Sequence, residues 1–304
     1  MMRVVPLILA MIWLSFVPRT AAQDNAQLEI GGGKIDFDFS STPAEPLRKL
    51  VLGWVTSSAR AVTVYYEQFP VSHLQLRLRI FEGRGVRGGR TTGWNGPAIA
   101  IAVGRSSTAS DFTEDWVLTH EMVHLAFPSV PEEHHWIEEG SATYVEPIAR
   151  ARAGDLTPEK VWGDLVDGLP QGLPQPGDRG LDFTPTWGRT YWGGALFCLL
   201  ADIEIRKRTG NKKGLEDALR GILKAGGTIE SDWPLTRTLE VGDGGTGVPV
   251  LRELYNKLKA APAAVDLNAL WKELGVERRD GKTEFNSGAP LAAIRKAITQ
   301  PKNR

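Results

Sequence analysis

The stretch His120-Glu121-Met122-Val123-His124 says more about fold and chemistry than any other part of the 304-residue sequence. It has the pattern H-E-x-x-H and lies in a segment with helical periodicity. Four residues advance an α-helix by about 400°, so the two imidazoles share one face. Two neutral imidazoles at this spacing suit zinc, which takes tetrahedral sets of nitrogen and oxygen ligands. Glu121 is placed to take a proton from the water that the metal activates.

The residues around this stretch predict a buried helix. Leu118 and Leu125 are apolar, as are the two residues between Glu121 and the second histidine. Unpaired histidines and a glutamate in such a helix would be costly, and a bound metal would offset that cost. We expect the helix to run from about Asp111, as N-cap with Glu114 completing a capping box, to about Phe127.

A catalytic zinc site needs a third protein ligand and one open position. The next predicted helix runs from about Glu133 to Ala153 and carries two candidate carboxylates, Glu138 and Glu139. Helical periodicity alone does not separate these neighbours.

The segment Trp136-Ile137-Glu138-Glu139-Gly140-Ser141-Ala142 resembles the gluzincin metallopeptidases, in which an aromatic-x-x-Glu-Gly-x-Ala pattern follows H-E-x-x-H. This resemblance implies that Glu139 is the third ligand, so that His120, His124 and Glu139 hold one zinc ion per chain. It also implies an α+β fold: a zincin-like, thermolysin-type catalytic domain with a small mixed sheet and an active-site helix, followed by a mainly helical lobe.

A second resemblance lies further along the chain. The segment Arg189-Thr190-Tyr191-Trp192-Gly193-Gly194-Ala195-Leu196 and the helices that follow it are similar to the glycyl aminopeptidase family, which has a Tyr-x-x-Gly-Ala helix there. The resemblance covers about residues 45–225. It implies that Tyr191 stabilises the transition state, as the equivalent tyrosine does in related aminopeptidases. A packing role at the start of a helix is the alternative for Tyr191.

The chain departs from that family in one segment. Many gluzincin aminopeptidases carry Gly-x-Met-Glu-Asn on the strand before the zinc helix, and its glutamate holds the substrate's free amine. This chain has Gly93-Trp94-Asn95-Gly96-Pro97 there, with no acidic residue. The sequence therefore leaves aminopeptidase and endopeptidase activity both open.

The N-terminus predicts a signal peptide over residues 1–22. Arg3 forms a short positive region, Val4 to Val17 is apolar, and Thr20-Ala21-Ala22 offers a cleavage site before Gln23. The apolar run is shorter than the roughly 20 residues that a spanning helix needs, which disfavours an uncleaved membrane anchor. We expect a secreted or periplasmic protein without a membrane span.

Composition narrows the function classes further. The chain has 36 basic and 36 acidic side chains, which argues against a nucleic-acid binder. The resemblance to metallopeptidases implies a peptide or protein substrate as the partner. The single cysteine, Cys198, excludes an internal disulfide and is expected to be a buried thiol. The sequence gives no indication of the oligomeric state.

The order of predicted elements divides the mature chain into three parts. Residues 23–167 form an α+β lobe with the zinc site, 168–188 a Gly/Pro-rich loop, and 189–304 a helical lobe. Five arginines between Arg77 and Arg90 indicate either an anion-binding patch or the solvated side of a strand and a Gly-rich turn. The Gly-rich segment Gly242–Gly247 is not followed by Lys-Ser/Thr, which argues against a phosphate loop, and we expect a turn there.

The sequence as a whole predicts an exported zinc-dependent metallopeptidase that hydrolyses peptide bonds. The first alternative is a catalytically inactive, peptidase-like binding module of the cell envelope, which would usually lack a ligand or the base. The second is a structural zinc site closed by a fourth protein ligand, which only His134 or His135 could supply.

Overall fold

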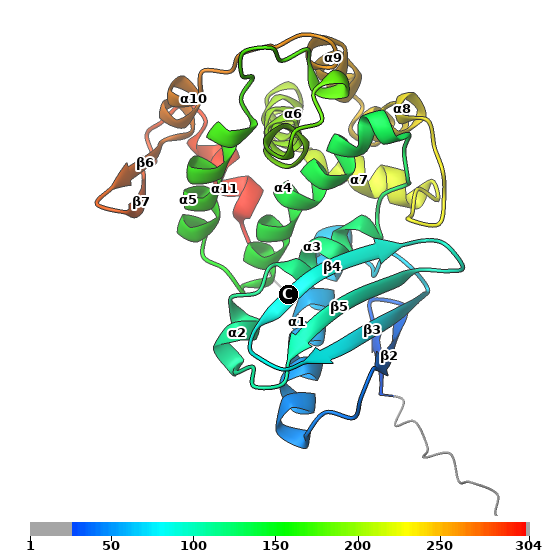
Figure 1. The fold of residues 1–304 in the computed structure, drawn as a ribbon. Coiled ribbons are helices and arrows are strands. Elements are labelled where there is room, and N and C mark those ends of the chain that lie inside the picture. The colour runs from blue at the N-terminus through cyan, green and yellow to red at the C-terminus, as the bar shows by residue number, and fades with distance from the viewer. Residues whose placement is uncertain (1–25, 302–304) are drawn as a thin grey trace, which may run out of the picture.

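The computed structural model describes residues 26–301 (Figure 1). The predicted signal peptide at residues 1–22 lies outside the described residues. Within the described part of the chain, no helix combines the length and the apolar character needed to cross a bilayer.

A five-stranded mixed sheet forms the first part of the fold. Its strand order is β1-β2-β3-β5-β4, in which β2, β3 and β5 are parallel and the edge strands β1 and β4 are antiparallel. The strands are β1 (Gln27–Ile30), β2 (Gly33–Phe39), β3 (His73–Phe81), β4 (Val86–Thr92) and β5 (Ala98–Gly104). Strands β1 and β2 form a hairpin at one edge of the sheet.

Strand β4 is a correction to the sequence prediction. The glycines after Arg79 predict a turn, but residues 86–92 pair with the apolar strand β5. The ladder is irregular between Arg87 and Gly89, where Gly88 has φ +56°. A bulge of this kind is tolerated at a sheet edge, so backbone pairing overrides the low strand propensity of glycine.

One face of the sheet carries the hydrophobic core. Leu74, Leu76 and Leu78 of β3 alternate with exposed residues and are buried against helix α1 (Glu45–Tyr66). Helices α3 (Val117–His124) and α4 (His135–Ala153) contact α1 and each other on the same side. Figure 1 shows α1 behind the sheet, and α3 and α4 above its β4 edge.

The predicted helix over residues 111–127 is broken in two. Helix α2 (Ala109–Thr113) has Thr108 as its N-cap, and Asp111 is the third residue of the capping box rather than the cap. Asp115 then accepts hydrogen bonds from the Leu118 backbone N–H and from the indole of Trp54, both at 3.1 Å. Because Asp115 satisfies an N–H group at the start of α3, a new helix begins there.

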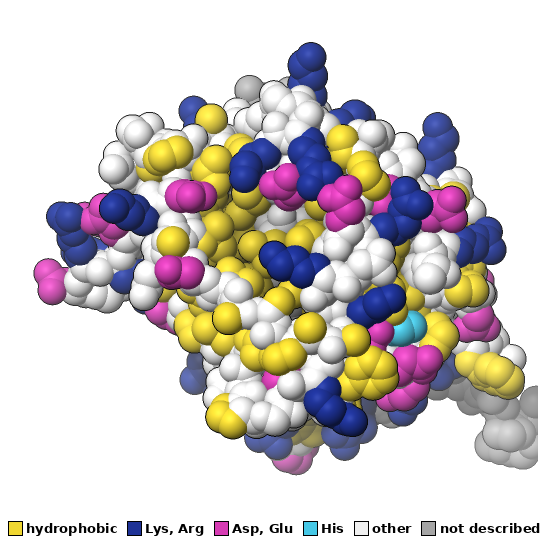
Figure 2. All heavy atoms as spheres, turned by 90° about the horizontal axis from the view of Figure 1, so that it is seen from above, with side chains coloured by type: hydrophobic (Ala, Val, Ile, Leu, Met, Phe, Trp, Pro, Cys, Tyr) yellow, Lys and Arg dark blue, Asp and Glu magenta, His cyan; other side chains and the backbone are white. Residues whose placement is uncertain are grey.

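Residues beyond α4 are mainly helical and include one small hairpin. The elements are α5 (Pro158–Gly168), α6 (Gly194–Arg208), α7 (Leu215–Lys224), α8 (Leu235–Thr246), α9 (Val250–Leu258), α10 (Leu267–Leu274), β6 (Val276–Arg279), β7 (Lys282–Phe285) and α11 (Ala292–Thr299). Cys198 is buried in α6, as predicted. On the face of this region seen from above, acidic and basic side chains lie intermingled (Figure 2).

The predicted turn at Gly242–Gly247 is wrong, because most of this segment lies in α8. Its glycines serve close packing against α7: a Cβ on Gly245 would lie 2.7 Å from the backbone oxygen of Asp217. A run of glycines disfavours a helix by itself, so the contact between α7 and α8 must supply the missing stability.

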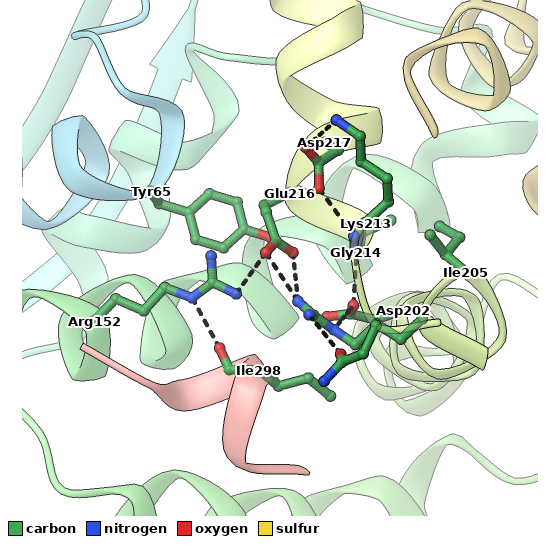
Figure 3. A network of polar contacts seen from close by, with 12 residues as sticks. Tyr65, Arg152, Asp202, Ile205, Lys213, Gly214, Glu216, Asp217 and Ile298 are labelled. Carbon is green, nitrogen blue, oxygen red and sulfur yellow. Dashed lines mark hydrogen bonds and ion pairs between the residues drawn. The ribbon is translucent and has the colours of Figure 1, made fainter. Parts of the chain in front are cut away.

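A buried ionic network ties four helices together (Figure 3). Glu216 of α7 accepts from the guanidinium groups of Arg152 on α4 and Arg206 on α6, at 2.8 to 3.0 Å. Arg206 also donates to Asp202 at 2.7 Å, and Arg152 donates to the backbone oxygen of Ile298 in α11. Burial alone would raise the pKa of Glu216, but the two arginines hold it at about 2.

Arg206→Met should destabilise the protein by about 3–5 kcal/mol, because it leaves buried Asp202 without its ion-pair partner and Glu216 with one arginine instead of two. Arg208→Met is the matched control on the same helix, since Arg208 is more exposed and its ion pair with Glu204 is worth about 1 kcal/mol or less. Urea unfolding of both variants measures the difference. Equal losses of stability would contradict a structural role for the network.

Candidate metal centre

The structure brings His120, His124 and Glu139 together. Their ligand atoms all lie within 4.8 Å of one another. Glu139 Oε2 is 3.1 Å from His120 Nε2 and 3.6 Å from His124 Nε2. The two imidazoles project from one face of α3, as the four-residue spacing predicts, and their ring centroids are 5.0 Å apart.

Glu138 and Glu139, which helical periodicity leaves unresolved, have different surroundings. Glu139 faces the two imidazoles of α3. Glu138 turns away from them: its Oε1 accepts from the Val130 backbone N–H at 2.7 Å, and its Oε2 lies 3.0 Å from His135 Nδ1. Of these two glutamates, only Glu139 is therefore placed to bind the same metal ion as the two histidines.

The neighbouring histidines do not join the cluster. His134 pairs with Asp182 at 3.1 Å. His135 Nε2 is 3.3 Å from Glu139 Oε1, on the other oxygen of that carboxylate. Hydrogen bonds with Glu138 and Glu139 raise the pKa of His135 to about 10, so its ring is charged at neutral pH and acts as a donor to Glu139. This arrangement does not supply the fourth ligand of a closed structural site.

Burial and neighbouring charges shift the pKa values of the three cluster residues in different directions. Burial lowers the pKa of His120, which keeps the imidazole neutral. Burial also acts to lower the pKa of His124, but its contact with Glu139 and the negative charges of Glu139, Glu121 and Glu138 together outweigh burial and raise this pKa. Although burial would raise the pKa of Glu139, hydrogen bonds from three histidines hold it well below its usual range. Glu139 is thus a carboxylate in the folded protein.

Glu121 is held against the edge strand β4. Its Oε2 accepts a hydrogen bond from the Thr91 hydroxyl at 2.7 Å. The absent side chain of Gly89 makes room, because a Cβ there would lie 2.6 Å from the Glu121 side chain. Thr91 and Gly89 were not identified from the sequence. Recognising β4 as a strand next to α3 would have pointed to them.

Tyr191 lies beside the cluster in an unusual local structure. The segment Arg189–Gly193 is a π-helical turn that leads into α6, and such turns are frequent at functional sites. The Tyr191 ring stacks on His120 with centroids 6.3 Å apart, and the exposed Trp187 also stacks on Tyr191, at 5.6 Å. Burial and the charges of Glu139 and Glu121 raise the pKa of Tyr191, so its phenol keeps the proton it would donate.

A contact between two glycines fixes this arrangement. A Cβ on Gly140 of α4 would lie 2.3 Å from the backbone of Gly194, and a Cβ on Gly194 would lie 2.1 Å from the Trp136 backbone oxygen. The two helices therefore touch backbone to backbone, one residue after Glu139 and three after Tyr191. Glycine inside a helix lowers stability by about 0.5–1 kcal/mol relative to alanine. The close contact explains why glycine nevertheless occupies both positions.

Other residues near the motifs lie elsewhere. Glu146 is buried with Arg150 at 2.9 Å, and Asp202 belongs to the ionic network described above. The segment 93–97 is the turn between β4 and β5, and Gly93 packs against the backbone of Ile229. The strand residues that contact Glu121 are Gly89 and Thr91, and neither is acidic.

Trp116 is a further aromatic neighbour that sequence reasoning missed. Its half-exposed ring meets the His120 ring edge to face, at a centroid distance of 5.5 Å. An aromatic residue just before a zinc-motif helix carries no periodic signal, so only the fold shows this contact.

The fold is similar to those of solved zinc peptidases. An aminopeptidase N family protein from Idiomarina loihiensis matches with a TM-score of 0.61 and 14% identity, over 83% of this chain and 49% of that chain. A point mutant of an M1 zinc metallopeptidase from Deinococcus radiodurans matches at 0.51 and 15%, over 80% and 52%. The same mutant bound to a Tyr-Ser-Ala substrate matches at 0.50 and 16%, also over 80% and 52%.

These likenesses confirm the α+β class and, at the level of the fold, the resemblance to gluzincin peptidases. The chain spans about half the length of the solved structures that it matches. No protein-family model matches the chain, and no curated protein matches it by sequence.

Gly194→Ala should destabilise the protein by about 1–3 kcal/mol, because the new methyl group overlaps the backbone of α4. Gly53→Ala on α1 is the matched control: a Cβ there meets nothing within 4 Å, so the change should stabilise by about 0.5–1 kcal/mol. Thermal unfolding measures both. A stable Gly194→Ala variant would show that the two helices can separate without cost.

Proposed function

We propose that this protein is a zinc-dependent metallopeptidase that hydrolyses peptide bonds. The observation that carries the proposal is the cluster of two imidazoles and one carboxylate on facing helices, with the carboxylate of Glu121 on the same helix as the imidazoles. The fold, which is similar to that of an M1 zinc metallopeptidase from Deinococcus radiodurans, supports it. The departure at residues 93–97 favours neither exopeptidase nor endopeptidase activity.

The residues present fit zinc. Two imidazole nitrogens and one carboxylate oxygen are the donor set of catalytic zinc sites, which keep a fourth position open. His120, His124 and Glu139 would hold one ion per chain, since their ligand atoms lie close together and their side chains are largely shielded from solvent. When bound, zinc supplies Lewis acidity that activates water and polarises the scissile carbonyl.

The other side chains supply proton transfer and charge stabilisation. Glu121 accepts the proton of the attacking water and returns it to the leaving amine as a general base and then acid. The Thr91 hydroxyl orients the Glu121 carboxylate through Oε2. Tyr191 donates from its phenol to the oxygen on which negative charge develops.

We also propose that the protein is exported and that it has the domain organisation expected from the sequence. The protein would be exported, with cleavage after residue 22, and secreted or periplasmic. Its catalytic lobe, residues 23–167, would be of the thermolysin type, followed by the loop at 168–188 and the helical lobe to residue 304. Removal of residues 1–22 from the protein recovered outside the cytoplasm, read by mass spectrometry, supports export.

Glu139→Gln should lose most of its zinc, because a neutral amide is a poor ligand and the buried imidazoles lose their anionic partner. Glu138→Gln changes the adjacent residue in the same way and should keep one zinc per chain. Metal content after dialysis measures both. The reverse pattern would move the ligand assignment to Glu138.

Glu121→Gln should keep zinc and lose hydrolysis of casein-derived peptides, because the general base is not a ligand. The wild-type protein should lose activity with chelator and regain it with zinc. A wild-type protein that binds zinc tightly but cuts no member of a broad peptide library would instead support the inactive binding module.

Tyr191→Phe should lower turnover by about 10²–10³, the usual cost of losing one oxyanion donor, with zinc content and KM nearly unchanged. Tyr144→Phe is the matched control. The Tyr144 hydroxyl donates to buried Asp202 at 3.0 Å, so its loss should lower thermal stability and leave turnover intact. Parental turnover in Tyr191→Phe would make Tyr191 a packing residue.

A further inference from the structure

The outer face of the sheet carries a trough between two rows of arginines. Its volume is about 460 Å³. One row is Arg77 and Arg79 on β3, and the other is Arg90 and Arg87 on β4. No helix of the described chain covers this face, which looks toward the viewer in Figure 1.

The strand register arranges the four arginines as a rectangle. Arg77 and Arg90 flank Ala100 of β5, and Arg79 and Arg87 flank Ala102. Two strand spacings separate the rows by roughly 10 Å, and two residues along a strand separate the members of a row by about 7 Å. The alanines of β5 form the floor, since their side chains end at Cβ.

The bulge in β4 is what brings its two arginines to one face. Residues three apart in a regular strand point to opposite faces. The extra residue Gly88, at φ +56°, has no partner on β5 and shifts the alternation of side chains by one residue. Arg87 and Arg90 therefore both face outward, while Gly89 faces Glu121.

The charges in the trough are largely uncompensated. Within residues 26–301, the guanidinium groups of Arg77, Arg79 and Arg90 have no ion-pair partner, and Arg87 lies over the Phe81 ring at 4.4 Å. Asp38, paired with Arg77 in the β2–β3 register, is the one acidic residue that lines the trough. The face in Figure 2 differs, because charges of both signs mix there.

We propose that this trough binds an extended acidic segment of a polypeptide, with four successive Asp or Glu residues. In an extended chain, side chains alternate between two sides and repeat on one side about every 7 Å, which matches the spacing within each arginine row. The first and third carboxylates would pair with one row, and the second and fourth with the other. A run of acidic residues repels itself and is extended in solution, which suits a straight trough.

The lining favours a peptide over other polyanions. Single-stranded nucleic acids bind through aromatic side chains on which the bases stack, and the trough is lined by no aromatic residue among those described. A membrane surface is broad, whereas this site is a hollow between two strands.

The test measures binding of a fluorescein-labelled Gly-Ser-Glu-Asp-Glu-Asp-Ser-Gly peptide by fluorescence anisotropy. The Glu121→Gln protein is used throughout, so that binding is read without cleavage and independently of the proposed peptidase activity. We expect saturable binding that weakens with salt. A peptide with the same four acidic residues separated by Gly-Gly pairs should bind more weakly.

Two double variants distinguish binding in the trough from non-specific electrostatic attraction to the protein. Arg77→Gln with Arg90→Gln should weaken binding about fivefold or more, as expected for two partly exposed charge pairs. Arg279→Gln with Lys282→Gln removes the same charge from the exposed β6–β7 hairpin and should leave the Kd unchanged. Equal effects in the two double variants would overturn the proposal.

Two further variants keep the charge of the arginines intact. Ala100→Tyr should weaken binding, because a ring on this exposed residue fills the floor. Asp38→Asn should tighten binding by removing a repulsive carboxylate, a gain that misfolding could not produce. Absence of saturable binding, or tighter binding of oligothymidylate or of phosphatidylserine vesicles than of the acidic peptide, would overturn the proposal.

Discussion

The backbone contact between Gly140 and Gly194 is the constraint on which the rest of the site depends. It sets the distance between α4, which carries Glu139, and the π-helical turn, which carries Tyr191. A side chain at either position would push the two elements apart, because a Cβ would fall 2.1 to 2.3 Å from backbone atoms. The placement of Tyr191 over His120 therefore follows from the packing of backbones, which are stiffer than side chains.

Two groups of charged side chains lie along α4, one next to this contact and one further along the helix. Next to it, the Glu139 carboxylate contacts three imidazoles, and its ligand atoms and those of His120 and His124 lie within 4.8 Å of one another. Further along α4, Arg152 joins Arg206 and Glu216 in the ionic network that attaches α6 and α7. Buried charges are costly unless they are paired, so the network holds α6 in one position relative to α4. Helix α4 thus carries both the proposed ligand Glu139 and Arg152, which fixes the helix relative to α6.

Local patterns in the sequence predict the parts of the structure that local physics determines. The four-residue spacing places His120 and His124 on one face, and alternation along residues 74–81 gives strand β3. Long-range contacts decide the parts that were mispredicted. Pairing with β5 makes a strand of glycine-rich β4, the contacts of Asp115 split one predicted helix into two, and packing against α7 makes the glycines of α8 helical. A family pattern favours Glu139 over Glu138 as the ligand, and in the fold Glu139 contacts His120 while Glu138 accepts from the Val130 backbone N–H.

Strand β4 shows why such a segment is hard to interpret from sequence. Its inward residues contact Glu121 and must be small or hydroxylated, since Gly89 leaves room and Thr91 supplies a hydrogen bond. Its outward residues are arginines that face solvent. A regular strand could not place Arg87 and Arg90 outward together, and the bulge at Gly88 removes that conflict. The two glycines of β4 that resemble a turn in the sequence therefore have separate roles. Gly89 leaves room for Glu121, the proposed base, and Gly88 forms the bulge that turns both arginines toward solvent.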